Sequence, residues 1–175
     1  MKKIIISLLV FIALIIGCKT NSDSSNTKKL DLTFESKSNS NVTGTASFVE
    51  KNGKVTFVAK MTGLKPGIHA IHIHEKSDCS SPDGKSTGGH WNPTFKNHGK
   101  WDVGEYHKGD IGNFTADEKG NGTITLTTNE WCIGCGDETK DILGKGLIVH
   151  QDPDDFTTQP TGNAGARVAC SAIIK

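Results

Sequence analysis

Seven residues with metal-binding side chains occur in the middle and C-terminal parts of this chain of 175 residues. They are His72, His74, His90, His98, His107, Asp110 and His150. Imidazole binds zinc and copper, and a carboxylate can complete a zinc site. Their arrangement predicts two adjacent metal ions that share one histidine.

The first two of these histidines lie in a segment with the alternating pattern of a β-strand, residues 67–75. His72 and His74 therefore point to one face, while Ile71 and Ile73 point to the other and can anchor the strand in a core. This pair alone is weak evidence, because most isolated histidines are surface residues or hydrogen-bonded core residues.

A long segment without apolar periodicity, residues 75–108, follows the strand. Loops of this length in a compact domain are usually functional or disordered. The segment and the residues just after it carry His90, His98, His107 and Asp110. Three imidazoles and one carboxylate can form a closed tetrahedral zinc site, and metal binding would supply the free energy that orders the loop.

A sixth ligand-type histidine, His150, ends the strand-like run 147–149. Three or four imidazoles from rigid strands make a good copper site. The strand histidines and His150 therefore predict a copper site beside the zinc site.

Five segments of the chain resemble the Cu/Zn superoxide dismutase family, across roughly residues 30–175. They are residues 67–75, 89–93, 107–113, 144–150 and 162–170. This resemblance implies that copper is bound by His72, His74, His90 and His150, and that zinc is bound by His90, His98, His107 and Asp110. His90 would then bridge the metals as an imidazolate, which two adjacent cations favour.

The resemblance also gives Asp154, four residues after His150, a supporting role. It would hydrogen-bond one ligand of each metal, expected to be His72 and His98, and so fix their ring orientation and tautomer. From the residues alone, Asp154 reads as a solvated carboxylate of an acidic loop.

Arg167 would lie beside copper, where its fixed charge suits a small anion such as superoxide; from the residues alone it is a surface arginine at the start of a strand. The implied activity is disproportionation of superoxide to oxygen and hydrogen peroxide by Cu(II)/Cu(I) cycling. His90 would be the second catalytic residue, taking up a proton, and zinc would be structural. The loop 151–165 contains no lysine, so attraction of the anion would rest on Arg167 and on other lysines such as Lys96.

Cysteine usage fits an exported protein. Besides Cys18 there are four cysteines, Cys79, Cys132, Cys135 and Cys170, which permit three pairings. The resemblance selects a disulfide between Cys79 and Cys170. The Cys132–Cys135 pair departs from the family pattern, and it fits a short structural disulfide, a redox pair or an accessory copper-docking site.

The predicted fold is all-β, an eight-stranded Greek-key barrel or sandwich with long metal-binding and active-site loops. Many Gly, Thr and Val residues with few aromatics favour short strands and turns. Expected strands are 30–35, 42–49, 55–61, 68–74, 111–115, 123–127, 147–150 and 167–174. The second and third flank an Asn-Gly turn, a strong hairpin signal.

The N-terminus reads as a bacterial lipoprotein signal peptide. Two lysines precede an apolar stretch of 13 residues, 4–16, which is shorter than the ~20 residues that span a bilayer. The prediction is a signal peptide over residues 1–17, lipid on Cys18, a flexible tether over 18–29 and the dismutase-like domain over 30–175. The alternative is ordinary signal cleavage with a spare cysteine. Lipid anchoring implies the cell envelope, periplasmic or surface-exposed.

Charge gives no sign of a nucleic-acid partner. The whole chain carries +1, and removing residues 1–17 takes away two lysines and no acids, leaving 18 basic against 19 acidic residues, or −1. The expected partners are superoxide and a membrane through Cys18, and a homodimer remains open.

Three other functions compete with the enzyme. A non-enzymatic copper-binding or copper-delivery module of the cell envelope would be expected to have lost ligands or Arg167, and a copper-only dismutase would have lost the zinc set. Neither loss has occurred. A surface adhesion domain with incidental histidines does not explain why all seven ligand-type residues occur at the positions that the family pattern requires.

Overall fold

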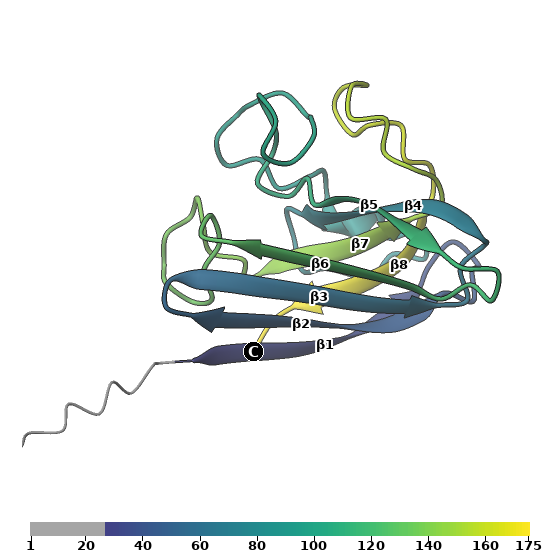
Figure 1. The fold of residues 1–175 in the computed structure, drawn as a ribbon, viewed down its shortest axis with the longest axis horizontal. Helices are drawn as coiled ribbons and strands as arrows, with labels where there is room; N and C mark the ends of the chain where they lie inside the picture. Colours follow the sequence, from purple (N-terminus) through teal and green to yellow (C-terminus); the bar gives the residue numbers. More distant parts are fainter. Residues whose placement is uncertain (1–26) are drawn as a thin grey trace, which may run out of the picture.

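Eight strands with alternating apolar and polar residues close into an antiparallel barrel in the computed structural model, which describes residues 27–175 (Figure 1). They are β1 (Lys28–Ser36), β2 (Thr43–Lys51), β3 (Lys54–Thr62), β4 (Gly67–His74), β5 (Gly112–Ala116), β6 (Gly122–Thr128), β7 (Lys145–His150) and β8 (Arg167–Ile173). Their hydrogen-bonded order is β1-β2-β3-β6-β5-β4-β7-β8. The predicted all-β, eight-stranded fold is confirmed.

Two crossovers give this barrel its Greek-key character, because β3 pairs with β6 and β4 pairs with β7. The second of these pairings sets His72 opposite Ile148 and His74 opposite Gly146. It therefore brings the histidines of β4 next to the end of β7, where His150 lies.

The β2–β3 hairpin forms where the Asn-Gly signal predicted it. Asn52 and Gly53 both have positive φ, 53° and 71°, which is the conformation that a two-residue type I′ turn requires. The paired register runs continuously from Thr43 opposite Thr62 to Lys51 opposite Lys54.

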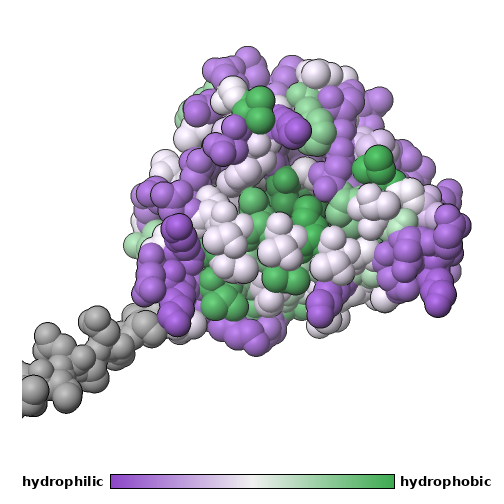
Figure 2. All heavy atoms as spheres, viewed as in Figure 1, coloured by the Kyte–Doolittle hydropathy of each residue, from purple (hydrophilic) through white to green (hydrophobic). Residues whose placement is uncertain are grey.

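The apolar residues that alternate along the strands also fill the interior of the barrel. Phe48 and Phe57 are fully buried with ring centroids 4.8 Å apart, and Trp131 packs edge-on against both. Ile71 and Ile73 belong to the same core, so the hydrophobic effect fixes the face of β4 that carries the histidines. Outside, Figure 2 shows a pale and green face ringed by hydrophilic residues.

The N-terminal strand starts at Lys28, two residues before the expected domain start at residue 30. Lys28 pairs with Glu50 in the β1–β2 register and forms an ion pair with it at 3.3 Å. The predicted signal peptide, Cys18 and nearly all of the predicted tether lie outside the described residues. Within residues 27–175, no helix is long and apolar enough to cross a bilayer.

Two long loops, residues 75–111 and 151–166, rise from the same side of the barrel (Figure 1). The first contains the short 3-10 helix η1 (Lys85–Thr87). A disulfide joins Cys79 in this loop to Cys170 in β8, which is the pairing that the resemblance implied. A second disulfide joins Cys132 and Cys135.

Candidate metal centre

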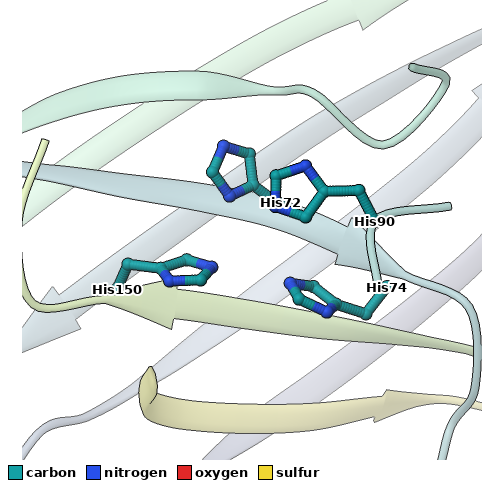
Figure 3. A group of neighbouring side chains, drawn as sticks. All are labelled: His72, His74, His90 and His150. Carbon is teal, nitrogen blue, oxygen red and sulfur yellow. The ribbon is translucent and has the colours of Figure 1, made fainter. Parts of the chain in front are cut away.

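Four imidazoles meet on the outer side of β4 and β7, beneath the two loops. His72 and His74 come from β4, His150 from β7 and His90 from the first loop, and their rings face a common space (Figure 3). Each is at most 4% exposed. One ring nitrogen from each lies within 4.8 Å of those of the others, so the four can share one ion.

His90 reaches this position because its loop folds back along β4. His90 forms an isolated β-bridge with His74, and the next residue, Trp91, donates its backbone N–H to Ile73 O at 2.9 Å. Gly109 lies against the same carbonyl, where a Cβ would come within 2.1 Å of Ile73 O. Glycine at 109 therefore lets the backbone of the first loop lie flat on the strand.

Several of these rings are anchored through one nitrogen, which leaves the other for a metal. His74 Nδ1 bonds the carbonyl of Gly88 at 3.0 Å, and His72 Nε2 bonds Asp154 Oδ2 at 2.8 Å. The opposite nitrogens are buried without a hydrogen-bond partner: His72 Nδ1, His74 Nε2, His90 Nε2 and His150 Nε2. Buried unpartnered nitrogens are costly. The donor set therefore fits a copper ion, which binds imidazole nitrogen well.

Asp110 is the centre of the second ligand set. Its carboxylate oxygens lie 2.8 Å from His90 Nδ1, 3.0 Å from His98 Nδ1 and 3.2 Å from His107 Nδ1. Four ligands at ~2.0 Å from a tetrahedral zinc ion are ~3.3 Å apart. His98 Nδ1 and His107 Nδ1 are buried and contact this carboxylate without hydrogen-bond geometry, so this set fits zinc.

His90 faces both sets, because its Nδ1 points to Asp110 while its Nε2 belongs to the four-histidine group. Burial, and then the neighbouring His72, lower the pKa of His90 to about 3. Its ring therefore resists a second proton and keeps one nitrogen lone pair for a metal. To bridge two metals it would also have to lose its remaining ring proton, which two adjacent cations favour. At His98, burial works against protonation, but Asp110 and Asp154 outweigh it and raise the pKa to about 9.

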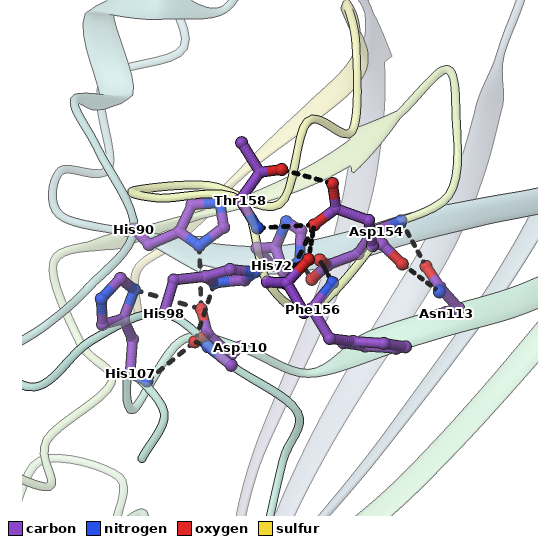
Figure 4. A network of polar contacts seen from close by, with 12 residues as sticks. His72, His90, His98, His107, Asp110, Asn113, Asp154, Phe156 and Thr158 are labelled. Carbon is purple, nitrogen blue, oxygen red and sulfur yellow. Dashed lines mark hydrogen bonds and ion pairs between the residues drawn. The ribbon is translucent and has the colours of Figure 1, made fainter.

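Asp154 connects the two sets (Figure 4). It is 3% exposed, and it accepts hydrogen bonds from His72 Nε2 at 2.8 Å and His98 Nε2 at 2.9 Å. Although burial acts in the opposite direction, these partners hold the pKa of Asp154 well below its usual range. Asn113 fixes its backbone through two 2.8 Å bonds. Sequence reasoning missed this role of Asn113, whose only signal is its place in the matched segment 107–113.

Arg167 lies at the mouth of the four-histidine group, in an open pocket of about 440 Å³ that His74 and His150 also line. Its Nη1 donates to Gly84 O at 2.9 Å and to Thr87 Oγ1 at 3.0 Å. These bonds use both hydrogens of Nη1 and leave the Nη2 and Nε hydrogens for an anion. The Cys79–Cys170 disulfide ties the segment of Gly84 to the strand of Arg167.

The lysine at this pocket is Lys85, which sequence reasoning did not single out. Lys85 is exposed, lines the pocket and pairs with Asp83 at 3.1 Å. Lys96, the lysine expected to attract the anion, does not line the pocket, and its Nζ lies 5.7 Å from the centroid of the Tyr106 ring. The pocket of Arg167 is therefore lined by one lysine from the disulfide-bonded segment, together with its ion-pair partner Asp83.

Comparison with known proteins gives one family, and the related solved structures include the two that follow. The model of the copper/zinc superoxide dismutase family matches residues 42–173. A clock protein, EA4, is 32% identical, with a TM-score of 0.71 over 83% of this chain and 94% of that one. A double mutant of a SOD-like protein from Bacillus subtilis is 30% identical, with a TM-score of 0.74 over 83% of this chain and 97% of that one. One of these structures is named a clock protein and the other a SOD-like protein, so neither name states dismutase activity.

Proposed function

Because the chain belongs to the copper/zinc superoxide dismutase family, we propose that it disproportionates superoxide to oxygen and hydrogen peroxide. The observation that carries this proposal is His90, a single buried imidazole that faces two complete ligand sets. Copper would be bound by His72, His74, His90 and His150, and zinc by His90, His98, His107 and Asp110.

Copper, when bound, supplies one-electron transfer by cycling between Cu(II) and Cu(I). The chain supplies the anion site, where the free N–H groups of Arg167 bind superoxide at the mouth of the pocket. It also supplies a proton carrier, because His90 Nε2 can hold a proton when it is not bound to metal, while Nδ1 stays directed at Asp110.

The zinc set has a structural role in this proposal. His98, His107 and Asp110 are at most 5% exposed, so superoxide cannot reach them. By binding one zinc ion together with His90, these three residues would tie distant points of the first loop together and hold His90 in place. A zinc ion there also favours the deprotonated, bridging form of His90.

The direct test is the superoxide disproportionation rate of residues 19–175 loaded with one copper and one zinc, beside Arg167→Ala. Fast turnover is expected for the unaltered protein. The variant should be about tenfold slower, because losing one charge-assisted hydrogen bond at a half-buried site costs ~1.4 kcal/mol. Arg167→Lys, which keeps the charge, should lie between them. Tight copper binding without turnover would favour the copper-binding module instead.

Lys85→Gln is expected to lower the rate about two- to threefold at low ionic strength and to have little effect at high salt. Lys85 is exposed at the pocket mouth, so its attraction for an anion is long-ranged and screened by salt. The measurement is the rate across a salt series. Lys96→Gln is the matched control, since its exposed lysine lies outside the pocket. Equal losses in both variants, or a loss independent of salt, would contradict this role.

For location, we propose that the protein is anchored to a membrane of the cell envelope through a lipid on Cys18. The support is the sequence pattern before Cys18. An exported dismutase would act on superoxide formed outside the cytoplasm, because the anion crosses bilayers poorly. Labelling with radioactive palmitate, compared between the unaltered chain and Cys18→Ser, tests the anchor, and equal labelling would exclude it.

A further inference from the structure

We propose that Cys132 and Cys135, when their disulfide is reduced, bind one Cu(I) ion at a site separate from the histidine groups. The pair lies in the loop between β6 and β7, drawn in green at the left end of the barrel in Figure 1. The proposed dismutase chemistry does not use it. The inference stands independently of that function.

The loop holds its shape through contacts other than the disulfide. Trp131 and Ile133, on either side of Cys132, are 1% and 2% exposed and belong to the barrel core. Cys132 donates its backbone N–H to Lys140 O at 2.9 Å and accepts from Ile142 N at 3.1 Å. Since core packing and backbone bonds fix the backbone around Cys132, the two sulfurs should remain neighbours after reduction.

The disulfide also adds little to the stability of the fold. Cys132 and Cys135 are 3 residues apart, whereas Cys79 and Cys170 are 91 apart. In the chain-entropy description, a crosslink stabilises more when it closes a longer loop. The short crosslink is therefore poorly explained as a structural staple, and we expect the barrel to stay folded when it is reduced.

The number of available ligands selects the metal. The ligand atoms of Cys132, Cys135 and Asp141 lie within 4.8 Å of one another. The carboxylate of Asp141 is already occupied: Oδ1 accepts from Gly134 N at 2.9 Å and Leu143 N at 3.1 Å, and Oδ2 accepts from Gly136 N at 2.9 Å. Two thiolates remain. They suit Cu(I), a soft ion that accepts two-coordinate sulfur, whereas a structural zinc site needs four ligands.

Access and charge agree with cation binding. Cys135 is exposed and Cys132 is 7% exposed, so a donor can approach through Cys135. Two exposed carboxylates, Asp137 and Glu138, belong to the same loop. The same loop borders an open groove of about 580 Å³, whose lining includes Gly136, Glu138 and also Trp91, the residue after His90.

The chemistry balances with a dithiol reductant. The reductant gives two electrons and two protons to the Cys132–Cys135 bond, which breaks to two thiols, and the reductant becomes a disulfide. Cu(I) then displaces both thiol protons and forms two copper–sulfur bonds. The oxidation state of copper does not change.

The test compares the full chain with Cys132→Ser/Cys135→Ser, both loaded with copper and zinc at the histidine groups. Each is treated with a dithiol, freed of it without oxygen and titrated with Cu(I) bicinchoninate. The unaltered chain is expected to take one more Cu(I) equivalent than the variant and to show copper–sulfur scattering in X-ray absorption. Because Cys18, Cys79 and Cys170 are common to both, the difference reports on the pair alone.

Equal uptake by the two proteins would overturn the proposal. So would a Cys132–Cys135 bond that resists the dithiol, as shown by counting free thiols with Ellman's reagent. If the double variant folds poorly, Cys135→Ser replaces it, because that side chain is exposed. One remaining thiolate should bind Cu(I) at least a hundredfold more weakly, and unchanged affinity there would likewise exclude the two-sulfur site.

Discussion

Removal of both metals by a chelator is expected to lower the melting temperature by about 15–30 °C. Each metal present at a thousandfold over its dissociation constant adds about 4 kcal/mol to the free energy of unfolding. For a domain of this size, 1 kcal/mol corresponds to about 2–4 °C. The structural reason is that the four-histidine group has four buried nitrogens without a hydrogen-bond partner among the described residues: His72 Nδ1, His74 Nε2, His90 Nε2 and His150 Nε2. Without metal these nitrogens are desolvated and uncompensated.

Calorimetry of the loaded, stripped and reloaded protein measures this change, with metal content checked in each sample. Zinc alone should restore much of the loss, because its ligands join distant points of one loop, His90, His98, His107 and Asp110. Copper would take three of its four ligands from strands β4 and β7, which are ordered by the barrel itself. A stripped protein that melts within about 5 °C of the loaded one would show that the ligand sets do not hold metals tightly.

The barrel was predictable because its signals are local. Alternation placed Ile71 and Ile73 in the core, and Asn52-Gly53 marked the hairpin turn. The ends of strands were less predictable, since they depend on partners far along the chain. Lys28 joins β1 because Glu50 lies opposite it, and no local pattern around residue 28 indicates that pairing.

In the site, residue type and family resemblance singled out the candidate ligand histidines, which the structure brings together in the two expected groups. They did not identify Asn113, Thr87 or Lys85. Their roles depend on how the loops fold against the barrel, which follows from a long-range disulfide and from backbone contacts between segments. Lys96 is the opposite case, a residue that the sequence suggested for anion attraction. It belongs to the first loop, but its side chain lies over the Tyr106 ring and not at the pocket.

Asp154→Asn is expected to weaken the binding of at least one of the two metals by about 10- to 100-fold. Asp154 accepts from His72 at one oxygen, and from His98 and the backbone N–H of Phe156 at the other. Asparagine has nearly the same shape but only one acceptor oxygen. In either orientation its NH₂ group faces an N–H donor, so one ring must turn or change tautomer and loses its metal-directed lone pair.

Competition with chromophoric chelators measures both affinities in this variant, and Asp152→Asn is its matched control. Asp152 is exposed in the same loop, so the control removes the same charge without disturbing a ligand ring. If Asp154 acted only through its negative charge, part of the loss would appear in the control as well. If it acts by orientation, the control binds both metals normally. Affinities within threefold of the unaltered protein for both metals in Asp154→Asn would mean that the ligand rings are held without it.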